Sequence, residues 1–258
     1  MRDYHPYWLQ WPNWRDFGSG QLGMWATHTM NLAFKAMRCD SLWFADPSPA
    51  ARQKRLIRIT ARVSSINTIS FPTWEAIDFA FPARGDMPPF TIHWWNGGDM
   101  PDIRRNIEAL WADIPGAGTT DRSTVGDGTP NWVGVTGKWS GASGTWIPGT
   151  AAQIHANAHN MSYSLHPLEK YKGFKGGPPR TLPRTSGPEM EWLNAIRGGR
   201  APMSSFDYSG PFVELLQLGN IATQFEEPLE FDPVEFKFTN NAKADGLLKQ
   251  PRRKEWEM

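Results

Sequence analysis

Four short segments of the sequence alternate apolar and polar residues with the period of two that is typical of half-buried β-strands. In residues 56–63, Ile57 and Ile59 fall on one face and Arg58 falls on the other. The same alternation recurs in residues 77–81, 90–95 and 234–238. Because the connections are short, the strands are expected to pair as antiparallel neighbours, and a β-sheet is predicted to dominate the fold.

Two helices are indicated in the C-terminal part of the chain. Ser186 can cap a helix that begins near Pro188 and ends at the two glycines of residues 198–199. Residues 211–225 carry apolar side chains at three- and four-residue spacing, and residues 204–210 are expected to form a loop before them. Both helices are predicted to cover one face of the sheet, so the chain is expected to form one α+β domain.

A glycine-rich stretch, GSGQLG at residues 18–23, satisfies the G-x-G-x-x-G pattern of dinucleotide-binding loops. That pattern has meaning only where a buried strand enters the loop and a helix leaves it. Residues 21–38 could form the helix. Residues 1–17, however, are aromatic and charged and contain two prolines, unlike the continuous apolar run of a buried parallel strand. We therefore do not assign these glycines to a nicotinamide cofactor.

The charge balance argues against several classes of partner. The 27 basic and 26 acidic side chains leave a net charge of +1, so no field of one sign recruits nucleic acid or an anionic membrane. No apolar stretch approaches the length of about 20 residues that spans a bilayer. The single cysteine, Cys39, excludes an internal disulfide but leaves both cytoplasm and periplasm open. Small or neutral ligands are expected, and the 14 tryptophans suit either core packing or stacking on sugar rings.

Five blocks of the sequence resemble, in order, the C-terminal domain of bacterial Gfo/Idh/MocA oxidoreductases, which act on sugars, inositols and glycosides with NAD or NADP. The blocks are residues 13–31, 71–98, 176–202, 205–222 and 252–256. The resemblance implies an α+β fold with a large, mostly antiparallel open sheet and helices packed on one face. It also implies that the Rossmann domain holding NAD or NADP lies outside this sequence. Residues 1–17 are then the remnant of an interdomain connection, and residues 18–258 are the substrate-binding and oligomerisation domain, any targeting signal being lost with the missing N-terminus.

In this family the catalytic side chains lie on the first helix of this domain, which follows a glycine-rich turn. The resemblance therefore implies that the glycines of residues 18–23 permit a tight turn and close backbone approach. The family pattern on that helix is an Asp, a His four residues later and often an Asp three further on, all on one face. Here these positions hold Met24, His28 and Asn31. The resemblance thus assigns His28 to accept the hydroxyl proton during hydride transfer, because the ordinary pKa of a histidine side chain is near neutrality. Asn31 is expected either to hydrogen-bond a sugar hydroxyl or to be an ordinary surface amide, and Met24 cannot replace a carboxylate.

Four further residues are weaker candidates. Arg15 and Arg180 are expected to contact substrate, with an Arg15 stacked on tryptophan and an Arg180 exposed to solvent as the alternatives. For His28 the alternative is a histidine hydrogen-bonded inside the domain. His155 and His159 lie four residues apart, like a zinc pair on a helix, but they lack the glutamate of H-E-x-x-H and a third ligand, so no metal site is expected.

Three functions are compatible with these expectations. The first is the substrate-binding and assembly domain of an NAD(P)-dependent oxidoreductase that acts on a sugar, an inositol or a glycoside. Without its cofactor domain, this chain alone is expected to be inactive and to bind no NAD(P). The alternative is a free-standing, non-enzymatic module that binds a carbohydrate or a protein partner, and a glycoside-cleaving hydrolase or lyase is a more distant third.

The strand alternation also predicts an interface between copies of the chain. His93 and Trp95 fall on the open sheet face, where they are expected beside Arg58, Thr60 and Arg62 of the neighbouring strand. Tryptophan and arginine are enriched at protein interfaces, and the family that the sequence resembles commonly dimerises through this sheet face. A homo-oligomer formed through the open sheet face is therefore expected, with a solvated sheet face as the alternative.

Overall fold

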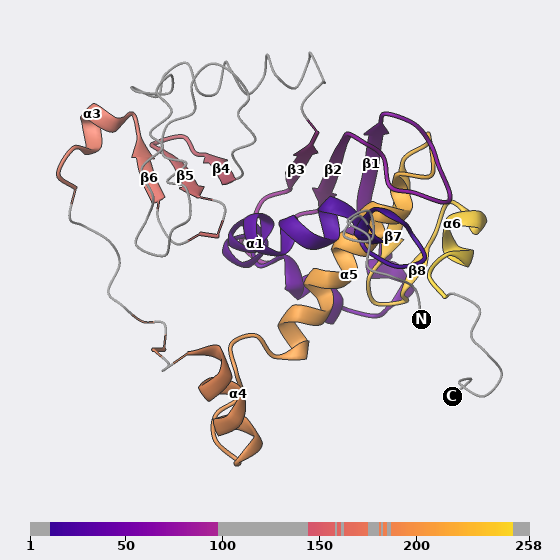
Figure 1. The fold of residues 1–258 in the computed structure, drawn as a ribbon. Coiled ribbons are helices and arrows are strands. Elements are labelled where there is room, and N and C mark those ends of the chain that lie inside the picture. The colour runs from indigo at the N-terminus through magenta and orange to yellow at the C-terminus, as the bar shows by residue number, and fades with distance from the viewer. Residues whose placement is uncertain are drawn as a thin grey trace, which may run out of the picture.

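The structure, a computed structural model, describes the chain in several ranges. They are residues 11–97, 144–157, 159–160, 163–174, 181, 183–184 and 187–249. The expectations for residues 1–10, for Arg180 and for the cap Ser186 lie outside the described residues. Within them the architecture is α+β, with a large antiparallel open sheet and long helices on one face, which confirms the predicted fold class (Figure 1).

Five strands form the larger sheet in the order β3-β2-β1-β7-β8, and every neighbouring pair is antiparallel. The strands are β1 (Ile57–Val63), β2 (Glu75–Phe81), β3 (Phe90–Asn96), β7 (Leu229–Asp232) and β8 (Lys237–Phe238). The apolar side chains of the first three share one buried face, namely Ile57, Ile59, Ile77, Phe79, Phe81, Ile92 and Trp94. The first three predicted strands are thereby confirmed.

The fourth predicted strand, residues 234–238, is wrong. The chain forms β7 earlier, then turns, and only two residues pair as β8. The Asp232 carboxylate accepts the backbone N–H groups of Val234 at 3.1 Å and Glu235 at 3.2 Å, which stabilises the turn. An aspartate followed by Pro233 therefore overrides the apolar alternation of this segment.

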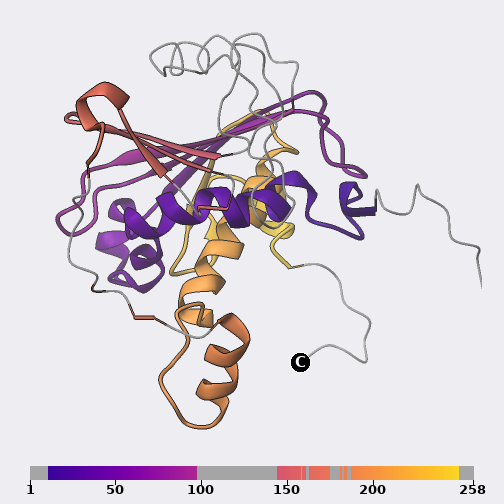
Figure 2. The same cartoon turned by 60° about the vertical axis from the view of Figure 1, so that its left-hand side comes forward.

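A second, three-stranded antiparallel sheet lies beyond β3. It consists of β4 (Gly144–Pro148), β5 (Gln153–Asn157) and β6 (Tyr163–His166), in that order. Figures 1 and 2 show it next to the β3 edge of the larger sheet, with one helix, α1 (Gly20–Ala36), running beneath both. The Thr145 hydroxyl donates a hydrogen bond to the Thr29 carbonyl of α1. This bond fastens the second sheet to the helix that carries the predicted site.

Two long helices, α1 and α5 (Phe206–Ala222), cover the apolar face of the larger sheet (Figure 2). They approach closely at Gly219, where a Cβ would lie 2.6 Å from Leu22 Cδ2 and 2.6 Å from Phe79 Cζ. The core therefore lies between these helices and the sheet. The shorter helical segments are η2 (Cys39–Phe44), η3 (Pro49–Lys54), α3 (Leu168–Tyr171) and α6 (Ala242–Gly246).

The expectation that both C-terminal helices cover the sheet is wrong for the first of them. The helix α4 (Pro188–Ile196) begins at the predicted Pro188 but buries none of its residues, and Trp192 is 61% exposed. Helix α1 lies against the sheet instead, because its apolar residues recur along one side. The expected loop at residues 204–210 is also wrong beyond its start, since α5 begins at Phe206.

A buried ion pair fastens the entry of β1 to the end of β7. Arg55 and Asp232 are joined by two hydrogen bonds, from Nε to Oδ1 at 2.7 Å and from Nη2 to Oδ2 at 2.8 Å. The Arg55 Nη1 group donates to the carbonyls of Asp46 and Ser48. Burial raises the pKa of Asp232, but the hydrogen bonds from Arg55 and from backbone N–H groups outweigh burial and hold that pKa below its ordinary value.

Candidate functional site

The glycine-rich turn enters α1 from a segment without an extended strand. Residues 11–17 consist of helical and other turns, with an isolated bridge between Trp14 and Ser70. A Cβ on Gly18 would lie 2.3 Å from the Pro12 Cα, and Gly20 adopts a φ of +61°. Both observations confirm that the glycines permit a tight turn and close approach. The strand required by a dinucleotide-binding loop is thus missing from residues 11–17.

The N-terminus of α1 lies beside a buried carboxylate. Its N-cap residue, Ser19, makes no side-chain capping bond. Glu75 of β2 is 2% exposed and accepts the Trp94 indole N–H at 2.9 Å. Burial raises the pKa of Glu75, and the Trp94 hydrogen bond, the Arg15 charge and the Leu22 backbone N–H oppose that rise. Because the helix dipole favours an acidic group beside the first turn, Glu75 fixes this end of α1 on the sheet.

Arg15 precedes the glycine-rich turn in the sequence, and its side chain hydrogen-bonds to the C-terminal end of α5. Its Nη1 and Nη2 groups donate to the Asn220 carbonyl at 3.0 Å and to the Thr223 hydroxyl at 2.8 Å, and Nε donates to the Asn67 carbonyl. Its guanidinium lies 4.5 Å from the centroid of the Phe71 ring. Burial lowers the pKa of Arg15 to about 10. The arginine is stacked, as the alternative expected, but on a phenylalanine rather than on a tryptophan.

The three positions of the family pattern share one stripe of α1. Met24, His28 and Asn31 are four and three residues apart within a continuous helix, so their side chains follow the same side. Met24 and His28 are exposed, and Asn31 is half-buried. The Asn31 Oδ1 atom accepts the hydroxyl of Tyr208, whose pKa is raised by burial. The Asn31 amide NH2 group makes no hydrogen bond to the described residues.

A second histidine, His159, lies next to His28, although the sequence alone did not predict it at this site. The His159 ring centroid is 4.8 Å from that of His28, and the two planes are inclined by 62°. The Trp25 ring lies 6.0 Å from His28 and 6.1 Å from His159. The Asn160 amide donates a hydrogen bond to the His28 backbone carbonyl. We call Trp25, His28 and His159 the imidazole cluster.

His155 and His159, four residues apart in the sequence, have different ring neighbours. His155 belongs to a strand rather than a helix, and its ring lies 6.0 Å from that of Trp146. His166 of β6 is 4% exposed and shares a 2.8 Å hydrogen bond with the Ser164 hydroxyl. Burial lowers the pKa of both His155 and His166. Within the described ranges, no group of three or more His, Cys, Asp or Glu side chains is placed to hold a metal ion.

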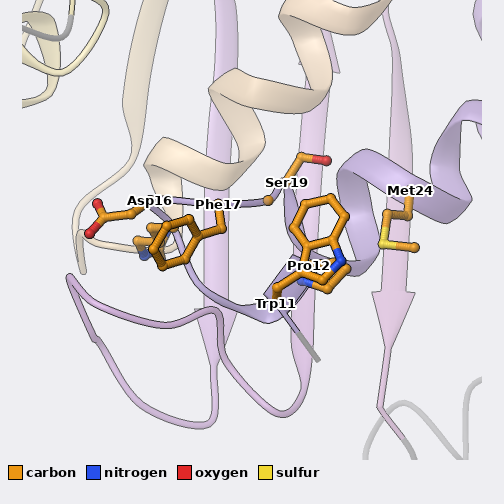
Figure 3. A pocket seen from close by; sticks show the side chains of 8 residues that line it. Trp11, Pro12, Asp16, Phe17, Ser19 and Met24 are labelled. Atoms are coloured by element: carbon orange, nitrogen blue, oxygen red, sulfur yellow. The ribbon is translucent and has the colours of Figure 1, made fainter. Parts of the chain in front are cut away.

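A shallow pocket of about 400 Å³ opens at the N-terminal end of α1 (Figure 3). Its lining residues are Trp11, Pro12, Arg15, Asp16, Phe17, Gly18, Ser19 and Met24. Trp11 and Phe17 are 52% and 69% exposed, so the rim is apolar and open to solvent. Met24 connects the pocket to the outward stripe of α1, whereas His28 and Asn31 do not line it.

The open face of the larger sheet carries an ion pair and a ring stack. His93 Nδ1 lies 2.7 Å from the Asp78 carboxylate, and that hydrogen bond raises the pKa of His93. The His93 and Trp95 rings stack at a centroid distance of 5.7 Å and an angle of 7°. Arg58 and Arg62, which were expected beside His93, lie on β1, and β2 separates that strand from β3. Thus Asp78, rather than Thr60, is the direct neighbour of His93.

The comparison with protein families matches the end of the chain. Residues 192–258 match the family model of Gfo/Idh/MocA enzymes that is described as "Oxidoreductase family, C-terminal alpha/beta domain". The matched segment contains α5, β7, β8 and α6. No curated protein matches the sequence significantly. Among the described helices, none has the length and apolar character needed to cross a membrane. Residues 192–258 are thus similar to the C-terminal α/β domain of the Gfo/Idh/MocA oxidoreductase family, in agreement with the resemblance in the sequence.

Proposed function

We propose that this chain is the substrate-binding and assembly domain of an NAD(P)-dependent oxidoreductase that acts on a sugar, an inositol or a glycoside. The observation that carries the proposal is the exposed histidine of the family pattern, His28, on the outward stripe of α1. Bound NAD or NADP would accept a hydride from the substrate carbon. The described residues offer no dinucleotide-binding loop, so we assign the cofactor to a domain outside this sequence.

In this proposal the imidazole cluster receives the polyhydroxylated substrate. The His28 imidazole accepts the proton of the hydroxyl group that is oxidised. The Trp25 ring, 41% exposed, offers an apolar surface against which a sugar ring can stack. The NH2 group of Asn31 donates to a second hydroxyl group of the same ligand.

Met24 is expected to limit the activity of the complete enzyme. The family pattern has a carboxylate at this position, whereas the Met24 thioether is exposed and uncharged. A thioether is a weak hydrogen-bond acceptor and cannot polarise a hydroxyl as an ionised carboxylate does. Proton removal by His28 therefore proceeds without an acidic neighbour on the same helix.

The two arginines enter the proposal in different ways. Arg15 lines the shallow pocket, but its guanidinium donates to three groups of the chain itself. We therefore propose Arg15 as a positioning residue that holds the glycine-rich turn and Met24 in place. Arg180 stays a predicted substrate contact that lies outside the described residues.

The proposal is tested by supplying a Rossmann domain from a Gfo/Idh/MocA enzyme, fused to or co-expressed with this chain. A panel of sugars and polyols is then assayed for NAD(P) reduction. Replacing the base, His28→Ala, should lower turnover by at least about 100-fold. Restoring the acid, Met24→Asp, should raise turnover. The matched control His93→Ala removes an exposed imidazole from the sheet face that points away from α1 and should leave turnover unchanged. Unchanged turnover in His28→Ala refutes the proton-transfer role.

A second candidate function is favoured by the Met24 position itself. Loss of the carboxylate is compatible with a non-enzymatic module that binds a carbohydrate through the same surface. That module would bind a sugar from the panel without any turnover in the Rossmann fusion, and Met24→Asp would not create activity.

We further propose that the open sheet face joins two copies of the chain. The support is the composition of that face, where the exposed His93 and the half-buried Trp95 and Asp78 form a partly aromatic surface. Two-fold symmetry would bring the same surface of each copy together. The oligomeric state measured by light scattering tests this part of the proposal.

A further inference from the structure

The imidazole cluster has the geometry of a two-histidine metal site. A tetrahedral ion about 2 Å from one nitrogen of each ring places the two ring centroids about 5 Å apart. The His28 and His159 centroids are 4.8 Å apart. Each imidazole offers two nitrogens, and rotation about χ2 in an exposed side chain selects which of them faces the partner ring.

The ring nitrogens of this pair are available for an ion. No hydrogen bond engages the His28 or His159 side chain within the described residues. Other imidazoles of the chain are engaged, since His93 pairs with Asp78 and His166 with Ser164.

The fold holds the two histidines together from distant parts of the sequence. His159 follows β5, and the neighbouring Asn160 side chain donates to the His28 carbonyl. The bond from the Thr145 hydroxyl to the Thr29 carbonyl fixes the same sheet to the same turn of α1. A pair that is pre-positioned in this way loses little conformational freedom when an ion binds.

One aromatic side chain lies beside both rings of the pair. Trp25 packs its ring near both imidazoles, which shields one side of the pair.

We propose that His28 and His159 bind a divalent transition-metal ion such as Zn²⁺, with water completing its coordination. Two protein ligands leave open positions, as in exchangeable rather than closed structural sites. The bound ion occupies the lone pair with which His28 would accept a proton. The site therefore goes beyond the proposed oxidoreductase function, and its occupation would inhibit that function.

The test uses the full chain without an affinity tag and Zn²⁺ alone as the probe. Calorimetry measures affinity and stoichiometry, and NMR of ¹³C-labelled imidazoles identifies the histidines that respond. One ion should bind, with shifts confined to two histidines whose signals are lost in His28→Ala and His159→Ala. Each substitution should weaken binding by about tenfold or more, and Asn160→Ala should weaken it less.

The matched control is His93→Ala, which should leave Zn²⁺ affinity unchanged. His28→Gln and His159→Asn serve as second variants if an alanine variant fails to fold, which circular dichroism reports. The proposal is overturned if no Zn²⁺ binds, if both substitutions leave the affinity unchanged, or if only the signals of His155 and His166 shift. None of these readouts requires turnover, so the result is independent of the proposed oxidoreductase activity.

Discussion

Removing the Asp232 carboxylate is expected to lower the free energy of unfolding by about 3–5 kcal/mol. The substitution Asp232→Ala leaves the Arg55 guanidinium, 1% exposed, without its two-pronged partner. A buried charge that loses its counter-ion has a cost of this size, since solvent cannot replace the lost interaction. The backbone N–H groups of Val234 and Glu235 lose their acceptor as well. The Glu235 carboxylate stays 3.4 Å from Arg55 Nη2 and offsets part of the loss, so the expected value stays within this range.

Two matched variants separate the ion pair from simple loss of packing. Arg55→Met removes the cation, but the carboxylate keeps its backbone donors and the Nε atom of Arg52 at 3.4 Å, so a smaller loss is expected. The double variant Arg55→Met with Asp232→Leu removes both charges. Its loss should be smaller than the sum of the single losses, because no unpaired buried charge remains.

Urea unfolding followed by circular dichroism at pH 7 measures these values, and unchanged m-values show that the comparison holds. The pH dependence supplies a second check. The folded pKa of Asp232 lies below its ordinary value of 3.8, so its stabilising contribution is complete above that value and is lost as the pH falls through the folded pKa. Asp232→Ala should flatten this acid-dependent loss. A cost below about 1 kcal/mol, or a double variant equal to the sum of the single losses, would refute the reasoning.

Three other outcomes are expected. Titration of the chain with NADH should give no saturable fluorescence change in the micromolar range, and such a change would overturn our interpretation of residues 18–23. Light scattering after size exclusion should detect a dimer that Trp95→Glu dissociates, whereas a monomer at all concentrations would eliminate the sheet-face interface. Gly219→Ala should destabilise the chain by about 1–3 kcal/mol in urea unfolding, because its Cβ would lie 2.6 Å from Leu22 and from Phe79. The matched change Gly210→Ala on the same helix should not, because no tertiary neighbour among the described residues lies within 4 Å of its Cβ.

The predictable part of the fold is the part dictated by local periodicity. The strands at residues 57–63 and 75–81 alternate in sequence because one sheet face packs against helices while the other stays open. The wrong assignments arise where a local rule was overridden. The side chain of Asp232 turns the chain inside an alternating segment. Helix α4 buries none of its residues against the part of the chain that the structure describes. The choice of α1 rather than α4 as the second covering helix depends on contacts between residues about 200 positions apart, such as Leu22 with Gly219.

The candidate site also has one part that the sequence predicts and one part that depends on tertiary structure. Helical spacing alone places Met24, His28 and Asn31 on one stripe, so this part of the site follows from the sequence. His159 reaches His28 only through the turn after β5 and the Asn160 bond to the α1 backbone, and four-residue spacing instead suggested a pair with His155. His28 therefore has as its neighbour an imidazole from the turn after β5, while the position of the family's carboxylate holds Met24. A carboxylate and an imidazole both accept hydrogen bonds. Only an imidazole beside His28 provides a second nitrogen ligand, so that the two side chains together can bind a transition-metal ion.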